Sequence, residues 1–379
     1  MFDYQKKRRY FGQTADDIKE LTTAEIETLG GKNVRTGYRG VYFSANPDAL
    51  YRINLRTALL NRVLAPLVSF TCRSADDIYR AANRINWQKF ISPEDTFAVF
   101  ASLSNSRITH SQYAALRVKD AIVDFFRDKT GQRPSVDTRY PDLWLNLHIE
   151  QDQAVLALDT SGGSLHRRSY RRKSVKAPMA ETLAASIIRY SEWHGERPLY
   201  DPFCGSGTLL CEAYLYLSQT PPALFRRQFG FERLPDFDKE LYTTVRDAAF
   251  ARVKTVDEGL ITGSDIDEGA ISASLRNCET LDKKGVVKIT QQNVFDLDGL
   301  ENRTIVCNPP YGIRLQHRAD LNGFYKRFGD FLKQRCKGST AYVYFGEREY
   351  IKKMGLRASW KKVLSNGGLD GRLVRYDMY

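Results

Sequence analysis

The stretch LYDPFCGSGT, residues 199–208, decides the fold that this sequence predicts. Its apolar start, which ends at Asp201, is typical of a short buried strand, and residues 209–217 have helical spacing. Gly205 and Gly207 allow a tight turn, so main-chain N–H groups at the helix N-terminus can hold a ligand's carboxylate or ribose. The stretch lacks the third glycine of the dinucleotide fingerprint and the Gly-Lys-Ser/Thr of a P-loop, which disfavours NAD and ATP. Taken alone, it could also be a plain strand-to-helix turn.

The residues around this stretch have the pattern of a parallel α/β sheet. From about residue 178 onward, helices alternate with short apolar strands. We expect strands at residues 199–201, 260–265, 287–291, 304–308, 339–345, 360–364 and 369–375.

Acidic residues follow the second of these strands. Asp265 ends the strand, and a carboxylate at the carboxyl edge of a sheet can accept hydrogen bonds from both hydroxyls of an adenosyl ribose. Ile266 would then pack on the adenine. Asp267 is better placed to cap the helix that begins near Gly269.

The sequence NPPYG, residues 308–312, is the most specific motif of the chain. It follows an apolar strand and therefore belongs to the same sheet edge as Asp201 and Asp265. An exocyclic amine of a nucleobase is a poor nucleophile, because its lone pair is delocalised into the ring. If the Asn308 side-chain oxygen and the Pro309 carbonyl accept its two N–H bonds, that lone pair points at a methyl donor. Pro309 and Pro310 stiffen the loop, and Tyr311 offers a ring on which the base can stack.

These motifs, in this order, resemble the class I methyltransferases that make N2-methylguanosine in RNA, in the subgroup with an N-terminal THUMP domain. The similarity extends to residues 165–170, 177–183 and 366–379 and so covers nearly the whole chain. It implies a Rossmann-like methyltransferase domain with a mostly parallel seven-stranded sheet, preceded by an α+β region with ferredoxin-like and THUMP parts. It also implies S-adenosylmethionine as cofactor.

The resemblance and the motifs together give the candidate site. We expect catalytic roles for Asn308, Pro309, Pro310 and Tyr311. We expect cofactor contacts from Asp201, Phe203, Cys204, Gly205, Gly207, Thr208, Asp265, Ile266, Asn293 and Asn308. The family usually has Asp after the third strand, where this chain has Asn293; its side-chain oxygen could still accept from the adenine amino group.

The N-terminal half has a mixed α+β pattern. We expect helices at residues 15–29, 48–64, 75–85 and 112–129, and strands at 40–44, 67–72, 97–103, 143–150 and 154–159. We divide the chain into a ferredoxin-like unit (1–65), a THUMP RNA-binding domain (66–165) and the methyltransferase domain (166–379), whose first residues, 166–177, form a basic linker.

The charge of the chain favours a nucleic-acid partner. Its 57 Lys and Arg against 45 Asp and Glu give a formal net charge of +12, and such a surplus attracts polyanions. The linker is basic and lacks acids, so we expect an RNA backbone track rather than a solvated connection. Its candidate RNA contacts are Arg167, Arg168, Arg171, Arg172 and Lys173.

Other features exclude several classes of protein. No apolar stretch is long enough to span a bilayer, and no secretory signal follows the basic N-terminus. The six cysteines form no C-x-x-C pair and the five histidines no ligand spacing, so we expect neither a metal site nor disulfides. Cys204 and Cys307 are better read as packing residues than as nucleophiles. A reducing cytoplasm fits best.

Within the family, this sequence resembles the bacterial enzymes that act on a guanosine of large-subunit 23S rRNA. Other relatives act on tRNA. A DNA adenine-N6 methyltransferase is the next alternative, because Asn-Pro-Pro-Tyr also serves that amine. Its recognition domain commonly follows the catalytic core, but here the extra length lies in front of it. A non-catalytic RNA-binding or ribosome assembly factor is the alternative from another class. The partner that we expect is structured RNA, with rRNA favoured over tRNA.

Overall fold

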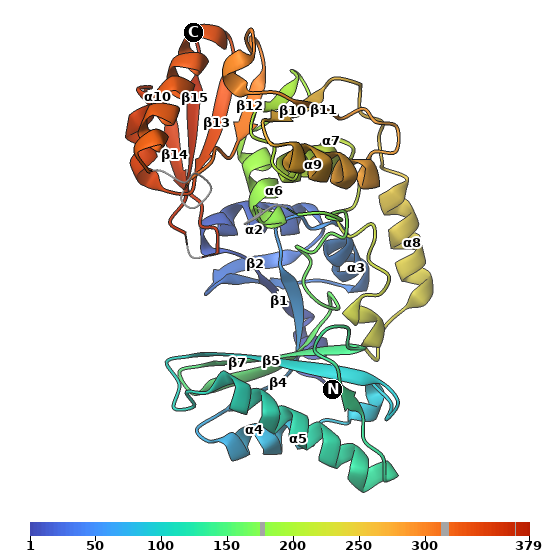
Figure 1. The fold of residues 1–379 in the computed structure, drawn as a ribbon. Coiled ribbons are helices and arrows are strands. Elements are labelled where there is room, and N and C mark those ends of the chain that lie inside the picture. The colour runs from blue at the N-terminus through green and yellow to red at the C-terminus, as the bar shows by residue number, and fades with distance from the viewer. Residues whose placement is uncertain (175–178, 312–317, 368) are drawn as a thin grey trace. The chain divides into compact units, whose positions relative to one another are not determined.

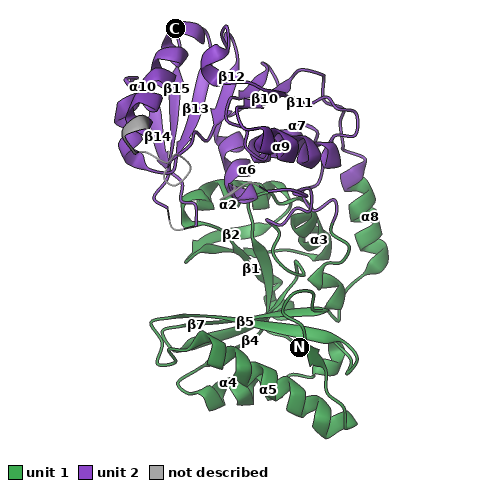
Figure 2. Cartoon of the chain, viewed as in Figure 1, with its two compact units in different colours: residues 1–165, 226–248 green, residues 166–225, 249–379 purple. Residues whose placement is uncertain are grey.

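The structure is a computed structural model that describes residues 1–174, 179–311, 318–367 and 369–379 (Figure 1). It divides into two compact units (Figure 2). Unit 1 contains residues 1–165 and 226–248, and unit 2 contains residues 166–225 and 249–379. The domain boundaries that we expect near residues 65 and 165 stay predictions.

Unit 1 is built on one eight-stranded sheet with the order β2-β3-β1-β4-β8-β7-β5-β6. β4 pairs antiparallel with β1 on one side and with β8 on the other, so it joins the two halves of the sheet. The strands are β1 (Arg9–Gln13), β2 (Lys32–Gly37), β3 (Gly40–Ser44), β4 (Arg62–Thr71), β5 (Thr96–Ser104), β6 (Ser135–Val136), β7 (Leu143–Glu150) and β8 (Gln153–Asp159).

The main helices of unit 1 lie on the convex side of this curved sheet (Figure 1). α2 packs against β2 and β3, and α5 packs against β5 and α4. The α5 helix ends at Gly131, which has a positive φ of 72°. The helices are α1 (Asp3–Lys7), the 3-10 turn Asp16–Ile18, α2 (Lys19–Thr28), α3 (Pro47–Arg56), α4 (Ala75–Asn83), the 3-10 turn Trp87–Lys89 and α5 (Ser111–Thr130).

The helix that the sequence predicts at residues 48–64 is wrong beyond Arg56. α3 ends there, Thr57 is extended, and β4 begins at Arg62. The reason is the carboxylate of Glu25 on α2, which accepts hydrogen bonds from the Thr57 hydroxyl at 2.6 Å and from the Ala58 N–H at 2.9 Å. These buried hydrogen bonds hold residues 57 and 58 in a non-helical conformation. Residue spacing along the sequence does not reveal such a contact.

Unit 2 contains a seven-stranded sheet with the order β11-β10-β9-β12-β13-β15-β14. The pairs from β11 to β13 are parallel, and β15 runs antiparallel to both of its neighbours. The mostly parallel seven-stranded sheet is thus confirmed. Its strands are β9 (Leu199–Asp201), β10 (Ile261–Asp265), β11 (Lys288–Gln291), β12 (Thr304–Cys307), β13 (Thr340–Phe345), β14 (Trp360–Val363) and β15 (Arg372–Asp377).

Helices connect the parallel strands of unit 2. α7 follows β9 and packs against α6, α9 and β10. α10 packs against the core around β12 and β13, where Leu321, Tyr325 and Phe328 are fully buried. The elements are α6 (Glu181–Tyr190), α7 (Thr208–Leu217), α9 (Glu268–Leu281), α10 (Arg318–Arg335) and the 3-10 segments Val294–Asp296 and Arg348–Met354. Between α7 and β10, the 3-10 turn Gly230–Arg233 and most of α8 (Lys239–Phe250) belong to unit 1.

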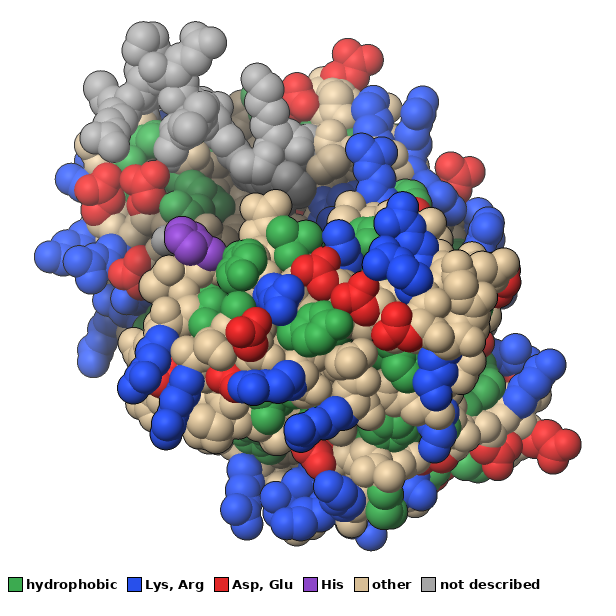
Figure 3. Space-filling model, turned by 90° about the horizontal axis from the view of Figure 1, so that it is seen from below, with side chains coloured by type: hydrophobic (Ala, Val, Ile, Leu, Met, Phe, Trp, Pro, Cys, Tyr) green, Lys and Arg blue, Asp and Glu red, His purple; other side chains and the backbone are tan. Residues whose placement is uncertain are grey.

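The excess of positive charge is not gathered in one place on the face shown in Figure 3. Lys and Arg side chains are spread over that face, with Asp and Glu side chains between them. Among the helices of the described residues, none is long and apolar enough to cross a membrane.

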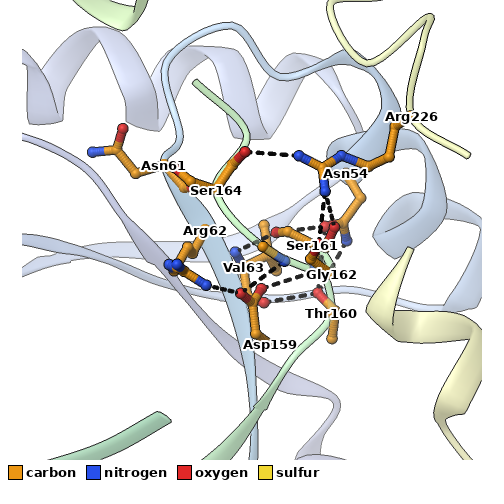
Figure 4. Close-up of polar contacts among 11 residues, drawn as sticks. Asn54, Asn61, Arg62, Val63, Asp159, Thr160, Ser161, Gly162, Ser164 and Arg226 are labelled. Carbon is orange, nitrogen blue, oxygen red and sulfur yellow. Dashed lines mark hydrogen bonds and ion pairs between the residues drawn. The ribbon is translucent and has the colours of Figure 1, made fainter. Parts of the chain in front are cut away.

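Residues 226–248 lie within the methyltransferase part of the sequence but belong to unit 1. The Arg226 guanidinium donates to the carbonyl oxygens of Ser161 and Gly162 at 2.9 Å and of Ser164 at 2.7 Å (Figure 4). Further along, the Tyr51 ring lies 4.6 Å from the Phe231 ring. A planar cation on three carbonyls and an aromatic cluster therefore attach this segment to the N-terminal sheet.

Candidate active site

The predicted site residues of unit 2 meet at one edge of its sheet. β9 pairs in parallel with β10, where Asp201 lies opposite Gly263, and with β12, where Tyr200 lies opposite Ile305. Because parallel strands end at the same edge, the loops after β9, β10 and β12 are neighbours. Asp201, Asp265 and Asn308 are the last residue of β9, the last residue of β10 and the first residue after β12.

The loop between β9 and α7 depends on two glycines with positive φ. Gly207, at 77°, is the N-cap of α7, and a Cβ there would lie 2.4 Å from the Ser274 hydroxyl of α9. Gly205, at 55°, has no atom closer to an added Cβ than the Phe203 carbonyl at 4.0 Å. Gly207 is therefore needed for packing between two helices, whereas Gly205 faces open space in which a ligand can lie against the backbone.

Asp201 and Asp265 stabilise this loop from the strand ends. The Asp201 carboxylate is buried and accepts from the Phe203 N–H at 3.0 Å, and burial raises its pKa well above the usual range. The Asp265 carboxylate accepts from the Gly205 N–H at 2.9 Å and from the Asp267 N–H at 3.0 Å. Each Asp265 oxygen has a second lone pair, so the carboxylate can still accept from ribose hydroxyls.

The neighbours of Asp265 take different roles. Asp267 caps α9 as predicted, because its carboxylate accepts from the Ala270 N–H at 2.7 Å. Ile266 is 66% exposed, so its side chain is available to a ligand. The Asn293 oxygen accepts from the Phe295 N–H at 3.1 Å and caps a short 3-10 turn, which leaves its other lone pair for the predicted adenine contact.

Asn308 is buried, and its side-chain oxygen has no hydrogen-bond partner among the described residues. An unpaired buried acceptor costs about 1–3 kcal/mol, so the position is unfavourable unless a ligand supplies the donor. Pro309 follows it in the loop, and Gly312 of the predicted motif lies outside the described residues.

Two residues that sequence reasoning missed hold the rest of this loop. The hydroxyl of Tyr325 on α10 donates to the Pro310 carbonyl at 3.1 Å, and burial raises the pKa of Tyr325, so the hydroxyl keeps its proton. The Tyr311 ring lies where a Cβ on Gly346 would approach it to 2.4 Å. Only glycine at the end of β13 thus leaves room for the Tyr311 ring in this position.

The glycine loop and the Asn308 loop pack on the same helix. The Phe203 ring lies 5.6 Å from that of Phe324, whose α10 neighbour Tyr325 holds the Pro310 carbonyl. Phe203, Tyr311 and Phe324 are all partly buried against one core cluster. A shared helix therefore couples the two loops within unit 2.

Two arginines of the basic linker have structural contacts, which corrects their assignment to an RNA track. Arg168 is buried, and its Nε donates to the Glu212 carboxylate of α7 at 2.8 Å. Arg171 donates to Glu181 at 2.8 Å and to the Thr208 hydroxyl at 3.1 Å. Neither guanidinium is placed to meet an RNA phosphate, and Arg171 instead braces the end of the glycine loop.

The same linker makes backbone contacts with α9. The Asn277 side-chain oxygen accepts from the N–H of Arg172 at 2.7 Å, and its nitrogen donates to the Ser206 carbonyl at 2.9 Å. The linker therefore supports the glycine loop, which its composition alone does not show. For Arg167, Arg172 and Lys173 the RNA contact stays a prediction. A carboxylate inside the apolar stretch of residues 208–217, at Glu212, is the signal that could have pointed to a buried cationic partner.

The remaining nucleophilic and ligating groups do not suggest other chemistry here. Burial raises the pKa of both the Cys204 and Cys307 thiols well above the usual range, as packing residues require. Within the described ranges, no group of His, Cys, Asp and Glu side chains is arranged to hold a metal ion.

The buried Arg168–Glu212 pair gives a stability prediction. Glu212→Ala leaves the buried guanidinium without its carboxylate, so we expect the free energy of unfolding to fall by about 3–5 kcal/mol in urea titrations. Replacing both partners, Arg168→Met with Glu212→Leu, should restore part of that loss. Glu279→Ala on the exposed side of α9 is the matched control, with a change of about 0.5 kcal/mol or less. Equal effects of the two alanine variants would contradict a structural role for the pair.

Comparison with known families covers almost all of the chain. Residues 11–64 match the RlmL ferredoxin-like domain, residues 72–159 the THUMP domain, and residues 168–375 the RMKL-like methyltransferase domain. The matches confirm the family resemblance that the motifs predict.

Individual proteins extend this similarity. The chain is 38% identical over 373 residues to "Putative RNA methyltransferase slr0064" of Synechocystis sp., covering 98% of this chain and 97% of the relative. It is 37% identical to the ribosomal RNA large subunit methyltransferase K/L of Syntrophotalea carbinolica, covering 98% of this chain but 53% of that protein. The chain thus spans about half the length of the K/L relatives.

Solved structures agree over the full chain. The crystal structure of SMU.472, described as a putative methyltransferase complexed with SAH, is 26% identical with a TM-score of 0.85, and the match covers 98% of both chains. A predicted N6-adenine-specific DNA methylase from Listeria monocytogenes is 26% identical with a TM-score of 0.83, covering 98% of this chain and 96% of that one. With the ferredoxin-like, THUMP and catalytic matches in one order along the sequence, the chain belongs to the family of RMKL-like methyltransferases.

Proposed function

We propose that this chain transfers the methyl group of S-adenosylmethionine to the exocyclic N2 amine of a guanosine in structured RNA, with 23S rRNA favoured over tRNA. The observation that carries the proposal is the buried and unpaired side-chain oxygen of Asn308 at the sheet edge, next to the loop of Gly205. A donor group of a substrate amine satisfies that oxygen.

The residues at the edge fit the cofactor. Gly205 leaves open space beside its backbone, Asp265 retains acceptor capacity for a ribose, and Ile266 is exposed for an adenine. These three residues, with Asp201, Phe203, Cys204, Gly207, Thr208, Asn293 and Asn308, are the proposed cofactor contacts. When bound, S-adenosylmethionine supplies an electrophilic methyl group on a positively charged sulfur.

The chain's own part in catalysis is to hold the amine. The Asn308 oxygen and the Pro309 carbonyl accept its two N–H bonds, so the nitrogen is held toward tetrahedral geometry and its lone pair is less delocalised into the ring. The Tyr311 ring packs against Gly346, and we expect it to stack with the base. Restricting the nucleophile to one orientation can contribute several kcal/mol, roughly 7 or more in well-oriented systems.

The choice of RNA rests on the N-terminal half. A THUMP match over residues 72–159 and a ferredoxin-like match over residues 11–64 precede the catalytic domain. The K/L relatives are named for large-subunit ribosomal RNA, and the Synechocystis relative for RNA. These names favour rRNA, whereas the Listeria neighbour keeps a DNA adenine substrate as the second candidate.

Asn308→Ala tests the mechanism. The variant removes the acceptor that orients the amine, so we expect methyl transfer to fall by about 100- to 1,000-fold, while affinity for RNA stays the same. The measurement is incorporation of labelled methyl groups into RNA from cells that lack the gene. Asn86→Ala, an exposed side chain in unit 1 without a capping bond, is the matched control.

The product of the same assay identifies the substrate. Nucleoside digestion and mass spectrometry should show N2-methylguanosine in the ribosomal fraction with the wild-type protein. Methylated adenine in DNA would instead support the second candidate. Unchanged activity of Asn308→Ala would overturn the mechanism, and a wild-type protein that retains no S-adenosylmethionine in equilibrium dialysis would point to an RNA-binding assembly factor.

Tyr325→Phe tests how the loop is held. The variant fills the same space but no longer donates to the Pro310 carbonyl, so the loop is less restricted. We expect kcat to decrease about two- to tenfold, the equivalent of one hydrogen bond, with little change in the KM for RNA. Tyr79→Phe removes a comparable bond to Asp124 in unit 1 and should leave kcat unchanged. A change confined to KM would show that Tyr325 affects substrate binding instead.

A further inference from the structure

Unit 1 contains a groove that the catalytic site does not use. It has a volume of about 840 Å³, and all of its lining residues lie between Asp3 and Ala157. Figure 1 shows why it forms: the eight-stranded sheet is strongly curved, and the helices lie on its outer side. Side chains on the inner side of the sheet line the groove, and they come from β1, β3, β4, β5, β7 and β8.

Exposed aromatic rings line one wall of the groove. Val41 and Phe43 of β3 are buried, so Tyr42 between them points to the opposite, open face, where it is 53% exposed. Its ring rests on that of Phe11 from β1 at 4.8 Å. Tyr38, in the turn between β2 and β3, is 55% exposed and also lines the groove. Half-exposed rings supported from behind are suited to stacking with planar ligands.

The opposite wall carries polar groups from β5 and β7. His148 Nδ1 and the Ser102 hydroxyl are 2.8 Å apart. Asn146 is nine-tenths buried, and its side-chain oxygen has no hydrogen-bond partner in the described part of the chain. No other side chain that lines the groove has such an orphaned atom. The N–H group of a ligand that reaches the floor of the groove would satisfy it.

The charges at the groove favour an anionic occupant. Four cations, Lys6, Lys7, Arg9 and Arg39, line it, against the two acids Asp3 and Glu150. Lys6 is paired with Asp3 at 2.9 Å, whereas Lys7 and Arg9 form no salt bridge with a described acid. Arg39 lies near Asp16, and its charge helps to lower the pKa of that carboxyl. A surplus of unpaired cations beside stacking rings is the arrangement that single-stranded nucleic acid needs.

We propose that this groove binds an unpaired segment of the RNA substrate, with a base stacked on Tyr42 and phosphates at Lys7, Arg9 and Arg39. The proposal rests on the proposed function only in taking RNA as the substrate. Bases must be unstacked from a duplex to meet aromatic rings, so the groove selects single-stranded nucleotides rather than helical RNA. The base edge supplies donors for Asn146.

Fluorescence anisotropy with the full chain and a labelled single-stranded oligoadenylate tests this. We expect Tyr42→Ala to weaken binding about five- to 150-fold, the range for loss of one stacked base. Tyr140→Ala, in unit 1 and 87% exposed outside the groove, should bind like the wild type. Arg39→Ala should lower the slope of log affinity against log salt by about 0.7, the contribution of one phosphate contact, whereas the exposed Arg84→Ala should not.

The outcomes separate this proposal from the proposed function. Oligoadenylate binding that depends on Tyr42 supports the groove even in a protein that transfers no methyl group. Equal affinity of Tyr42→Ala and wild type, or equal affinity for a blunt RNA duplex and the single strand, would overturn it. So would a groove variant, Asn146→Leu or Tyr42→Ala, that loses a polypeptide partner while its RNA affinity is unchanged.

Discussion

Parallel pairing of β9 with both β10 and β12 is the constraint on which the candidate active site depends. Strand order reverses between β9 and β12, so the chain turns in opposite directions along the sheet after β9 and after β12. The crevice between those departing loops is where ligands bind in open α/β sheets. An antiparallel strand at either position would carry Asp265 or Asn308 to the far edge, and the acceptors would no longer be neighbours.

Buried polar contacts stabilise this edge at points where the backbone has little regular structure. The glycine loop has Asp265 on one side, and Arg171 and Asn277 on the other. Asp265 lies at the end of β10, Asn277 on α9 and Arg171 in the linker, so three separate parts of unit 2 hold the loop. The exposed side of the glycine loop therefore stays open to a ligand. The charged groups that hold the loop lose part of their hydration, so each of them needs a partner.

Sequence reasoning could predict what depends on local pattern and could not predict what depends on long-range contacts. The parallel sheet and the strand ends at Asp201 and Asp265 follow from alternation and turn residues. The roles of Arg168 and Arg171 do not, because a basic run has the same composition whether its guanidinium groups face solvent or a buried Glu212. The end of α3 depends on Glu25, more than thirty residues earlier, and β2 is too polar to predict as a strand. The acceptor role of Asn308 is inferred from what an exocyclic amine needs in order to react, and it stays a prediction.

The chain passes between the two units three times, near residues 165, 225 and 248, and the last passage lies inside α8. A single flexible linker lets two domains separate freely, whereas several connections restrict their separation. Arg226 follows one of these passages directly and binds three carbonyls of residues 161–164, which precede another. The Arg226 side chain therefore joins, within unit 1, the segment before the passage near residue 165 to the segment after the passage near residue 225. These passages join the two units into one covalent framework even though each unit has its own core.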